Sequence, residues 1–226
     1  FEKWELNCKE IGEVTNTGRV EIYHFNEKVV DIPTNSLVLG GDAPQYDMPS
    51  KKPEYIEKMT SFNIDMLDTK NENFNNTLLI LLSSLNITSK QYVYNQYDST
   101  VRTNTVVGPG SDAAVIRIKG TEKAISMSTD CNGRYVYLDP KQGGMLAVAE
   151  SARNVVCSGA KPIAITNCLN FGNPQDPEVY WQFKEAVLGI GDMCRILDTP
   201  VTGGNVSFYN ETLESAVYPT PTIGMV

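Results

Sequence analysis

The feature that most constrains the fold of this chain is a long amphipathic helix predicted between Asp176 and Leu197. Asp176, Pro177 and Glu178 form a strong start signal, because the carboxylate caps free amides, proline tolerates the first helical position and an acid favours the first turn. Apolar residues then recur three or four positions apart, giving one buried face over roughly five turns: Val179, Phe183, Val187, Ile190, Cys194 and Leu197. Pro200 ends the helix. Such a face must pack against a sheet or another helix.

The segments around this helix predict an α+β fold, with a mixed β-sheet and packed helices. β-like runs stand at 113–118, 124–129, 162–166 and 222–226. A second helix is predicted at 144–158, with Gly159 in the position of a C-terminal glycine cap. The predicted order is therefore two strands, a helix, a strand, the long helix and a final strand.

A glycine-led segment, 199–210, follows the long helix. Gly203 and Gly204 leave the backbone amides open to the phosphates of a ligand. If residues 205–209 form a strand, its polar side chains share one ligand-facing side: Asn205, Ser207 and Tyr209. The alternative is an ordinary glycine turn that leads into a half-exposed strand, and the pattern taken alone favours that interpretation.

Three further polar clusters fall at the ends of the predicted elements, at 110–112, 129–134 and 167–173. Together with the two glycines they offer carboxylates, amide oxygens, backbone amides and an arginine. This set suits a magnesium-bound nucleotide, because Mg²⁺ prefers oxygen ligands and phosphates prefer N–H donors. It does not suit zinc. Taken singly, each cluster is more typical of a turn than of a ligand site.

The chain before residue 107 predicts two further parts. Residues 1–46 have the pattern of the end of another α+β domain, with short strands at 11–14, 20–25 and 29–33 and a helical turn at 35–39. Residues 47–106 predict a helical connector.

Within this connector, a helix is predicted to start at Pro53, and Thr88 is predicted to cap a short helix. An apolar stripe over 74–85 predicts a core seam.

Composition excludes several classes of function. A net charge of -8 argues against a protein that coats nucleic acid or an anionic membrane. The longest apolar run, 78–82, is far shorter than the ~20 residues that cross a bilayer. Five widely spaced cysteines without a Cys-x-x-Cys pair predict neither a zinc site nor a disulfide framework, and favour a reducing cytoplasm. His24 is the only histidine, so a Ser-His-Asp or Cys-His catalytic apparatus is not expected.

Three long motifs resemble the second half of the phosphoribosylformylglycinamidine synthase family. They are Asp-Cys-Asn-Gly-Arg-Tyr-Val-Tyr-Leu-Asp-Pro at 130–140, Asn-Cys-Leu-Asn-Phe-Gly-Asn-Pro at 167–174 and Thr-Gly-Gly-Asn-Val-Ser at 202–207. Residues 11–14 and 96–98 resemble the middle section of the same family. The resemblance covers nearly the whole chain. Because both ends also look cut from a longer protein, we expect an internal fragment.

The resemblance implies a position within an internally duplicated enzyme. Residues 1–46 would be the C-terminal end of the α+β domain of the first half, and residues 47–106 the connector. Residues 107–226 would be the ATP-binding-type domain of the second half, truncated at its C-terminus, with the fold of the aminoimidazole ribonucleotide synthetase-like superfamily.

The resemblance also implies a reaction and its partners. The family enzyme is a ligase of de novo purine biosynthesis that converts formylglycinamide ribonucleotide, ATP and glutamine-derived ammonia to formylglycinamidine ribonucleotide. The implied cofactors are ATP and Mg²⁺. The implied partners are formylglycinamide ribonucleotide, the catalytic first half of the same polypeptide and a glutaminase subunit or domain, with no nucleic acid and no membrane.

Carried over by motif, Asn167 and Gly204 are expected to contact ATP, Asn205 to bind magnesium and Ser207 to contact the substrate. Family members often have aspartate in place of Asn167, so that contact would survive as a hydrogen bond without its charge. An auxiliary nucleotide or metal site is expected to use two carboxylates, Asp112 and Asp130.

One departure from the family bears on activity. The first half of the family carries a Glu-Ser-His-Asn-His-Pro catalytic segment where this chain has residues 129–134, without a histidine. We therefore expect no catalytic residue in this chain and no activity of the fragment alone. One alternative is a silent scaffold half that holds a structural nucleotide. Another is a related enzyme, such as aminoimidazole ribonucleotide synthetase or a selenophosphate or thiamine-phosphate kinase, against which the long motifs count.

Overall fold

The structure is a computed structural model that describes residues 1–38, 41–67, 70 and 73–226. It divides into two compact units, Phe1–Asp47 and Met48–Val226. The predicted domain divisions at 46 and 106 stay predictions. The end of the predicted helical turn, at 39, lies outside the described residues.

The first unit is built around a β-hairpin. A short 3₁₀ helix, η1 (Glu2–Trp4), precedes strands β1 (Arg19–His24) and β2 (Glu27–Pro33), which pair antiparallel, and η2 (Thr34–Leu37) follows. An ion pair joins the two strands, with Lys28 Nζ of β2 2.6 Å from Glu21 of β1, and Lys28 also lies 3.1 Å from Asp31 of its own strand. The predicted strand at 11–14 is wrong: its apolar side chains, Ile11 and Val14, are fully exposed and no strand is assigned there.

The second unit begins with short helices: α1 (Glu54–Thr60), η3 (Ile64–Met66), α2 (Phe74–Ser83), α3 (Gln91–Tyr94) and η4 (Val101–Thr103). The predicted core seam in α2 is wrong, because Phe74 and the apolar residues at 78–82 are each at least 50% exposed. The N-cap of α3 is Lys90, two residues after the predicted Thr88. In the part of the chain that the structure describes, no helix has the length and apolar character needed to span a membrane.

Helix α1 is anchored by the aromatic ring and hydroxyl of Tyr55. The ring stacks on that of Tyr137 at 4.1 Å between centroids, and the hydroxyl donates to the Tyr137 carbonyl oxygen at 2.8 Å. The same hydroxyl accepts from Gln182 Nε2 at 2.8 Å. Burial raises the pKa of Tyr55 to about 12, so the phenol keeps its proton at neutral pH and can act as the donor.

A mixed six-stranded sheet forms the centre of the second unit. Its strands are β3 (Thr105–Val107), β4 (Ala114–Arg117), β5 (Ala124–Asp130), β6 (Ile165–Asn170), β7 (Val201–Ser207) and β8 (Thr220–Met225). They lie in the order β3-β4-β5-β8-β6-β7. Strands β6 and β7 are parallel, and the other neighbours pair antiparallel. The predicted α+β class with a mixed sheet is confirmed.

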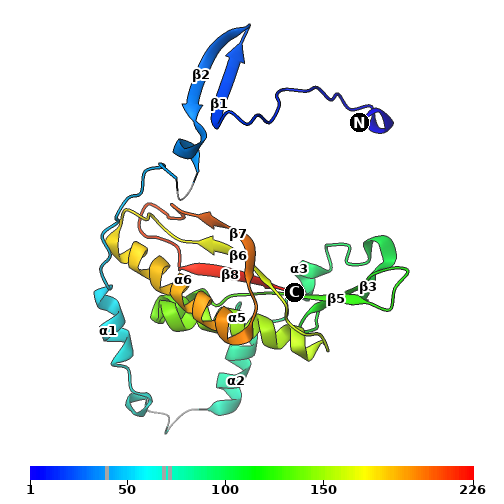
Figure 1. Cartoon of the computed structure of the whole chain (residues 1–226). Helices are drawn as coiled ribbons and strands as arrows, with labels where there is room; N and C mark the ends of the chain where they lie inside the picture. Colours follow the sequence, from blue (N-terminus) through cyan, green and yellow to red (C-terminus); the bar gives the residue numbers. More distant parts are fainter. Residues whose placement is uncertain (39–40, 68–69, 71–72) are drawn as a thin grey trace. The chain divides into compact units, whose positions relative to one another are not determined.

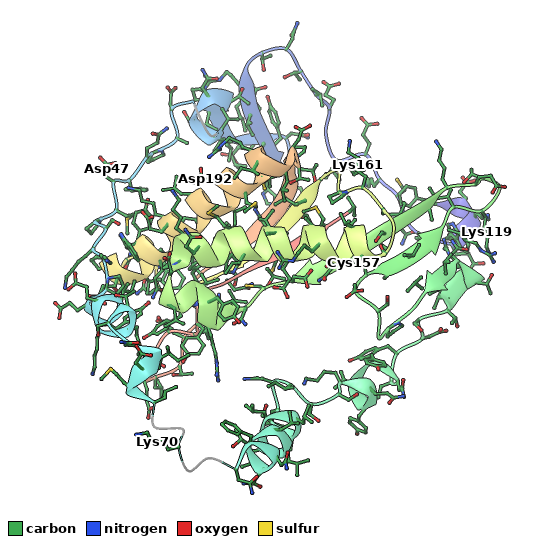
Figure 2. All side chains as sticks on the ribbon, turned by 90° about the horizontal axis from the view of Figure 1, so that it is seen from below. Asp47, Lys70, Lys119, Cys157, Lys161 and Asp192 are labelled. Carbon is green, nitrogen blue, oxygen red and sulfur yellow. The ribbon has the colours of Figure 1, made fainter. Side chains whose placement is uncertain are left out.

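Helices cover one face of this sheet. They are α4 (Gly133–Leu138), α5 (Pro140–Cys157) and α6 (Pro177–Leu197), and α5 and α6 lie side by side along β6 and β8 (Figure 1). Seen from the helix side, α5 lies in front of the sheet, with Cys157 at its C-terminal end (Figure 2). The core between the layers is closely packed and includes Val148, Val155, Ile165, Phe171, Ile190, Ile223 and Met225.

The start signal predicted for α6 is confirmed, since the Asp176 side chain accepts from the Glu178 amide at 2.8 Å. Helix α5 begins at Pro140, four residues before the predicted start, because Asp139 caps it by accepting from the Gln142 amide at 3.1 Å. Helix α4 was not predicted. Its Asn132 cap accepts from the Arg134 amide at 3.1 Å.

Two predicted strand boundaries are also corrected. Strand β6 extends to Asn170, and β7 starts at Val201 and ends at Ser207. Asn167, expected in a loop after the strand, therefore lies within strand β6. On the helix-facing side, Ile165 and Leu169 of β6 and the alternate residues of β8 are buried, and Asn167 between them is partly buried. The opposite face is largely polar, so neither strand shows a continuous apolar run.

Two helix glycines set the distance between α5 and α6. A Cβ on Gly189 would overlap the backbone carbonyl of Lys141, and one on Gly144 would lie 2.5 Å from the Ala186 carbonyl oxygen. Gly191 differs, because its nearest neighbour is the flexible guanidinium of Arg195 at 3.4 Å.

We predict that Gly189→Ala lowers the free energy of unfolding by about 2 kcal/mol, because the methyl group forces the helices apart. Gly191→Ala should leave it unchanged or raise it by up to about 1 kcal/mol, since alanine favours a helix interior. Urea unfolding of both variants and of the wild type measures the difference. Equal effects of the two substitutions would contradict the close-packing argument.

Candidate functional site

The residues predicted to bind ligands lie on neighbouring strands at one edge of the sheet. In the parallel register of β6 and β7, Asn167 is level with Gly204 and Asn170 with Ser207. Residues level with each other point to the same face of a sheet, and successive residues alternate. Asn205 and Ser207 therefore share the face away from the helices, whereas Asn167 shares the helix-facing side with Gly204.

The backbone of Gly204 lies directly against Asn167. A Cβ at residue 204 would overlap both the side-chain Oδ1 and the backbone carbonyl oxygen of Asn167, and φ of Gly204 is 156°. A Cβ at Gly203 would meet nothing within 4 Å. The two glycines thus have different roles: Gly204 permits a close approach of the strands, and Gly203 leaves an open stretch of backbone.

The face away from the helices is lined with amides and hydroxyls. Asn205 is exposed and level with Cys168, which is in turn level with Thr222 of β8. Asn170 Nδ2 donates within β6 to the Cys168 carbonyl oxygen at 2.9 Å and joins β6 to β8 by donating to the Thr220 carbonyl oxygen at 3.1 Å. This surface offers neutral oxygen atoms and no charge of its own.

These donors match only part of a magnesium site. Mg²⁺ prefers six oxygen ligands, usually carboxylates and phosphates completed by water. Asn205 supplies one neutral amide oxygen, and no strand residue level with it or next to it on that face is a carboxylate. Across the described ranges, no group of three His, Cys, Asp or Glu side chains gathers to hold a metal. The set therefore fits a metal held mainly by phosphates or by another part of the protein.

Asn210, for which the sequence predicts no role, holds the Ser207 side chain. Asn210 Nδ2 lies 3.1 Å from Ser207 Oγ, and Asn210 Oδ1 lies 3.3 Å from the same atom. Nδ2 also donates to the carbonyl oxygens of Ser207 at 2.8 Å and Phe171 at 3.0 Å. The sequence signal that could have predicted this contact is an asparagine three residues after a serine at the end of a strand. That spacing is also common in turns, so it is not specific.

Asp130 is engaged inside the protein. Its carboxylate accepts from the hydroxyl of Ser128, from Ser151 Oγ at 2.9 Å and from Asn154 Nδ2 at 2.8 Å, which ties β5 to α5.

The neighbouring Cys131 thiol is not a candidate nucleophile. Burial, followed by the charges of Glu150 and Asp130, raises the pKa of this thiol to about 12, so it stays protonated and unreactive at neutral pH.

Asp112, in contrast, is exposed in the turn before β4. The two carboxylates of the predicted auxiliary site are thus in different settings, and the auxiliary site stays a prediction.

The predicted binding residues form an open strand surface rather than a closed pocket. Three cavities of about 500, 570 and 690 Å³ are lined by none of Asn167, Gly204, Asn205 and Ser207. The first of them lies at the C-terminal ends of α5 and α6, and its lining includes Cys157 and Lys161, which Figure 2 labels. A ligand at β6 and β7 would need a second wall from elsewhere.

Comparison with known proteins identifies what the chain is similar to. A family model described as "AIR synthase related protein, N-terminal domain" matches residues 110–226. The phosphoribosylformylglycinamidine synthase subunit PurL of Salinibacter ruber is 55% identical over the whole chain, and that of Chlorobaculum tepidum is 56% identical. The chain spans 30% of the length of each of these relatives.

Solved structures of Thermotoga maritima PurL are similar in fold. PurLQS matches with a TM-score of 0.69 and 29% identity, over 94% of this chain and 32% of that chain. PurL complexed with ATP matches with a TM-score of 0.65 and 29% identity, over 94% and 32%. PurL complexed with FGAR matches with a TM-score of 0.63 and 29% identity, over 92% and 30%.

We predict that Gly204→Ala destabilises the protein by about 1–3 kcal/mol, because the added methyl group pushes Asn167 and β6 away from β7. Gly203→Ala is the matched control in the same strand and should change the free energy of unfolding by less than about 0.5 kcal/mol, as for an open surface position. Thermal unfolding of both variants gives the comparison. Equal stability of the two variants would show that the close contact with Asn167 is not required.

Proposed function

Because the chain belongs to the AIR synthase related protein family, we propose that it forms part of a phosphoribosylformylglycinamidine synthase. The proposed reaction is the ATP-dependent conversion of formylglycinamide ribonucleotide and glutamine-derived ammonia to formylglycinamidine ribonucleotide in purine biosynthesis. Identity of 55–56% to PurL subunits over the whole chain supports this assignment. Bound ATP would supply the phosphoryl group that activates the amide oxygen of the substrate.

The observation that carries the proposal is the arrangement of β6 and β7. We propose that Asn167 and Gly204 contact ATP, that Asn205 binds magnesium and that Ser207 contacts the ribonucleotide. Asn205 and Ser207 lie two residues apart on the same face of β7, which supports one ligand contacting both. Asn167 and Gly204 are level with each other on the opposite face, so the ligand would reach them over the open edge of β7, the last strand of the sheet. The open backbone at Gly203 suits phosphate oxygens, which accept hydrogen bonds from backbone amides. The similar PurL structures with ATP and with FGAR are consistent with both ligands.

This chain would supply one wall of a shared site. Its candidate binding surface is open, and it offers Mg²⁺ one neutral ligand at Asn205. The proposed partners are a catalytic half in the same polypeptide, which would bring the missing charged ligands, and a glutaminase that delivers ammonia. The proposed location is the cytoplasm, where free cysteines such as Cys157 and Cys168 stay reduced.

A scaffold half that holds a structural nucleotide is the second candidate. It would need free carboxylates or donors at the auxiliary position. Asp130 already accepts three hydrogen bonds from within the protein, which disfavours it as a metal ligand. Of the two carboxylates predicted for that site, Asp112 is the exposed one. The geometry therefore favours the role in a shared catalytic site.

The proposed function predicts the effect of Asn205→Ala in the complete enzyme. The magnesium-ATP concentration for half-maximal rate should rise about tenfold, the change expected when a contact of about 1.4 kcal/mol is lost. Steady-state rates at varied magnesium-ATP and saturating formylglycinamide ribonucleotide measure it. Thr212→Ala, a polar substitution in the nearby loop, is the control and should leave the value unchanged. Unchanged kinetics for Asn205→Ala would leave only the scaffold role.

A second prediction concerns the 226-residue chain by itself. Isothermal titration with ATP and Mg²⁺ should give weak or undetectable binding, because an open strand surface supplies only part of the ligands. The chain should also show no synthase activity alone. Tight binding by the isolated chain would contradict the shared site and would favour a complete nucleotide site within these residues.

A further inference from the structure

Asn210 connects the ends of the two strands that carry the proposed site. Its Nδ2 donates to the Phe171 carbonyl just beyond β6 and to the Ser207 carbonyl at the end of β7. Its backbone amide donates to the same Phe171 carbonyl at 3.1 Å, and the Tyr209 amide donates to the Gly172 carbonyl at 2.9 Å. These contacts fix the turn after β7 against the segment after β6.

The turn has an unusual backbone at Tyr209, whose φ is 61°. A bulky residue rarely adopts the left-handed region, and it persists there only when surrounding contacts hold it. This conformation reverses the chain directly after β7, so that the Asn210 side chain faces back toward Ser207. The neighbouring Phe208 ring packs edge-on against Phe183 at 5.1 Å between centroids, which secures the turn from the core side.

Counting hydrogens assigns the direction of the Ser207–Asn210 hydrogen bond. An asparagine amide nitrogen carries two hydrogens, and its oxygen carries none. Three oxygens lie within reach of Nδ2: the carbonyl oxygens of Ser207 at 2.8 Å and Phe171 at 3.0 Å, and Ser207 Oγ at 3.1 Å. The two carbonyl oxygens are nearer and take its two hydrogens. They also fix the orientation of the amide, because a flipped Oδ1 would face two carbonyl oxygens. The hydroxyl hydrogen of Ser207 is then left to donate to Asn210 Oδ1 at 3.3 Å.

We propose that Asn210 is a positioning residue that presents the Ser207 hydroxyl as a hydrogen-bond acceptor. With its hydrogen held by Asn210, Ser207 offers only lone pairs to a ligand. The group that it recognises is then an O–H or N–H donor of the ribonucleotide, such as a ribose hydroxyl or an amide, and not a phosphate oxygen, which accepts hydrogen bonds. The identity of the ligand as formylglycinamide ribonucleotide rests on the proposed function.

The test uses the complete enzyme with Asn210→Ala, Ser207→Ala and the double variant. Each single variant should raise the KM for formylglycinamide ribonucleotide about tenfold, one lost hydrogen bond in a binding site. The KM for ATP should stay within about twofold, and the double variant should be no worse than Ser207→Ala, because both substitutions remove the same contact. Ser207→Thr keeps the hydroxyl and should retain a near wild-type KM.

Inhibition by inorganic phosphate, competitive with formylglycinamide ribonucleotide, probes the polarity of Ser207. Its inhibition constant should be unchanged by Ser207→Ala at a pH above about 8, where the phosphate oxygens are mostly deprotonated acceptors and make no favourable contact with another acceptor. A parallel loss of phosphate inhibition would overturn the acceptor assignment. Additive effects in the double variant, or equal rises in both KM values, would show that Asn210 acts only on stability.

Two further outcomes separate this inference from the proposed function. A wild-type enzyme that does not turn over formylglycinamide ribonucleotide would overturn the proposed function and, with it, the ligand assigned to Ser207. A wild type that does turn it over, with Asn210→Ala folded and its KM unchanged, would overturn the role of Asn210 alone. Thr212→Ala, whose hydroxyl donates to the Ser215 carbonyl in the same loop, is the matched control and should leave both KM values unchanged.

Discussion

The contact between α5 and α6 over one face of the mixed sheet is the constraint on which the second unit depends. Glycines at 144 and 189 let backbone meet backbone, so that the two helices together cover β6 and β8. The main cluster of buried apolar side chains then lies on one side of the sheet. The other side is free to carry hydroxyls and amides, which would be costly in a sheet buried on both faces.

One-sided burial also explains where the candidate site lies. Strand β7 is at the sheet edge, and β6 lies between β7 and β8, so polar residues of both strands reach the surface without disturbing the core. The close approach at Gly204 and the hydrogen bonds of Asn210 hold the two strands in one register along the site. A rigid pair of strands is better suited than a loop to hold ligand groups at fixed spacing. The function proposed for this surface therefore follows from its rigidity as much as from its residue types.

The surface is also incomplete. The proposed shared site would account for a neutral amide such as Asn205 on an open face and for the use of Asp130, within residues 129–134, to attach β5 to α5. Asp130 is partly buried, and the three hydrogen bonds satisfy a carboxylate that would be costly to withdraw from water without partners. In this chain the Asp130 carboxylate therefore helps to pack α5 against β5, and the face of the sheet away from the helices carries amides and hydroxyls.

The sequence by itself determined the α+β class, the boundaries of α6, the glycine cap after α5 and the motifs that mark the family, because capping residues, proline and apolar periodicity are local signals. It did not determine that Asn167 lies within β6, that α2 is exposed or that Asn210 holds Ser207. A strand with one polar face contains no continuous apolar run, so its first and last residues are hard to predict from the sequence. The burial of a helix depends on which other elements pack against it. Only the tertiary structure decided which side of the sheet each polar residue faces, because pairing register, a property of two strands, sets that side.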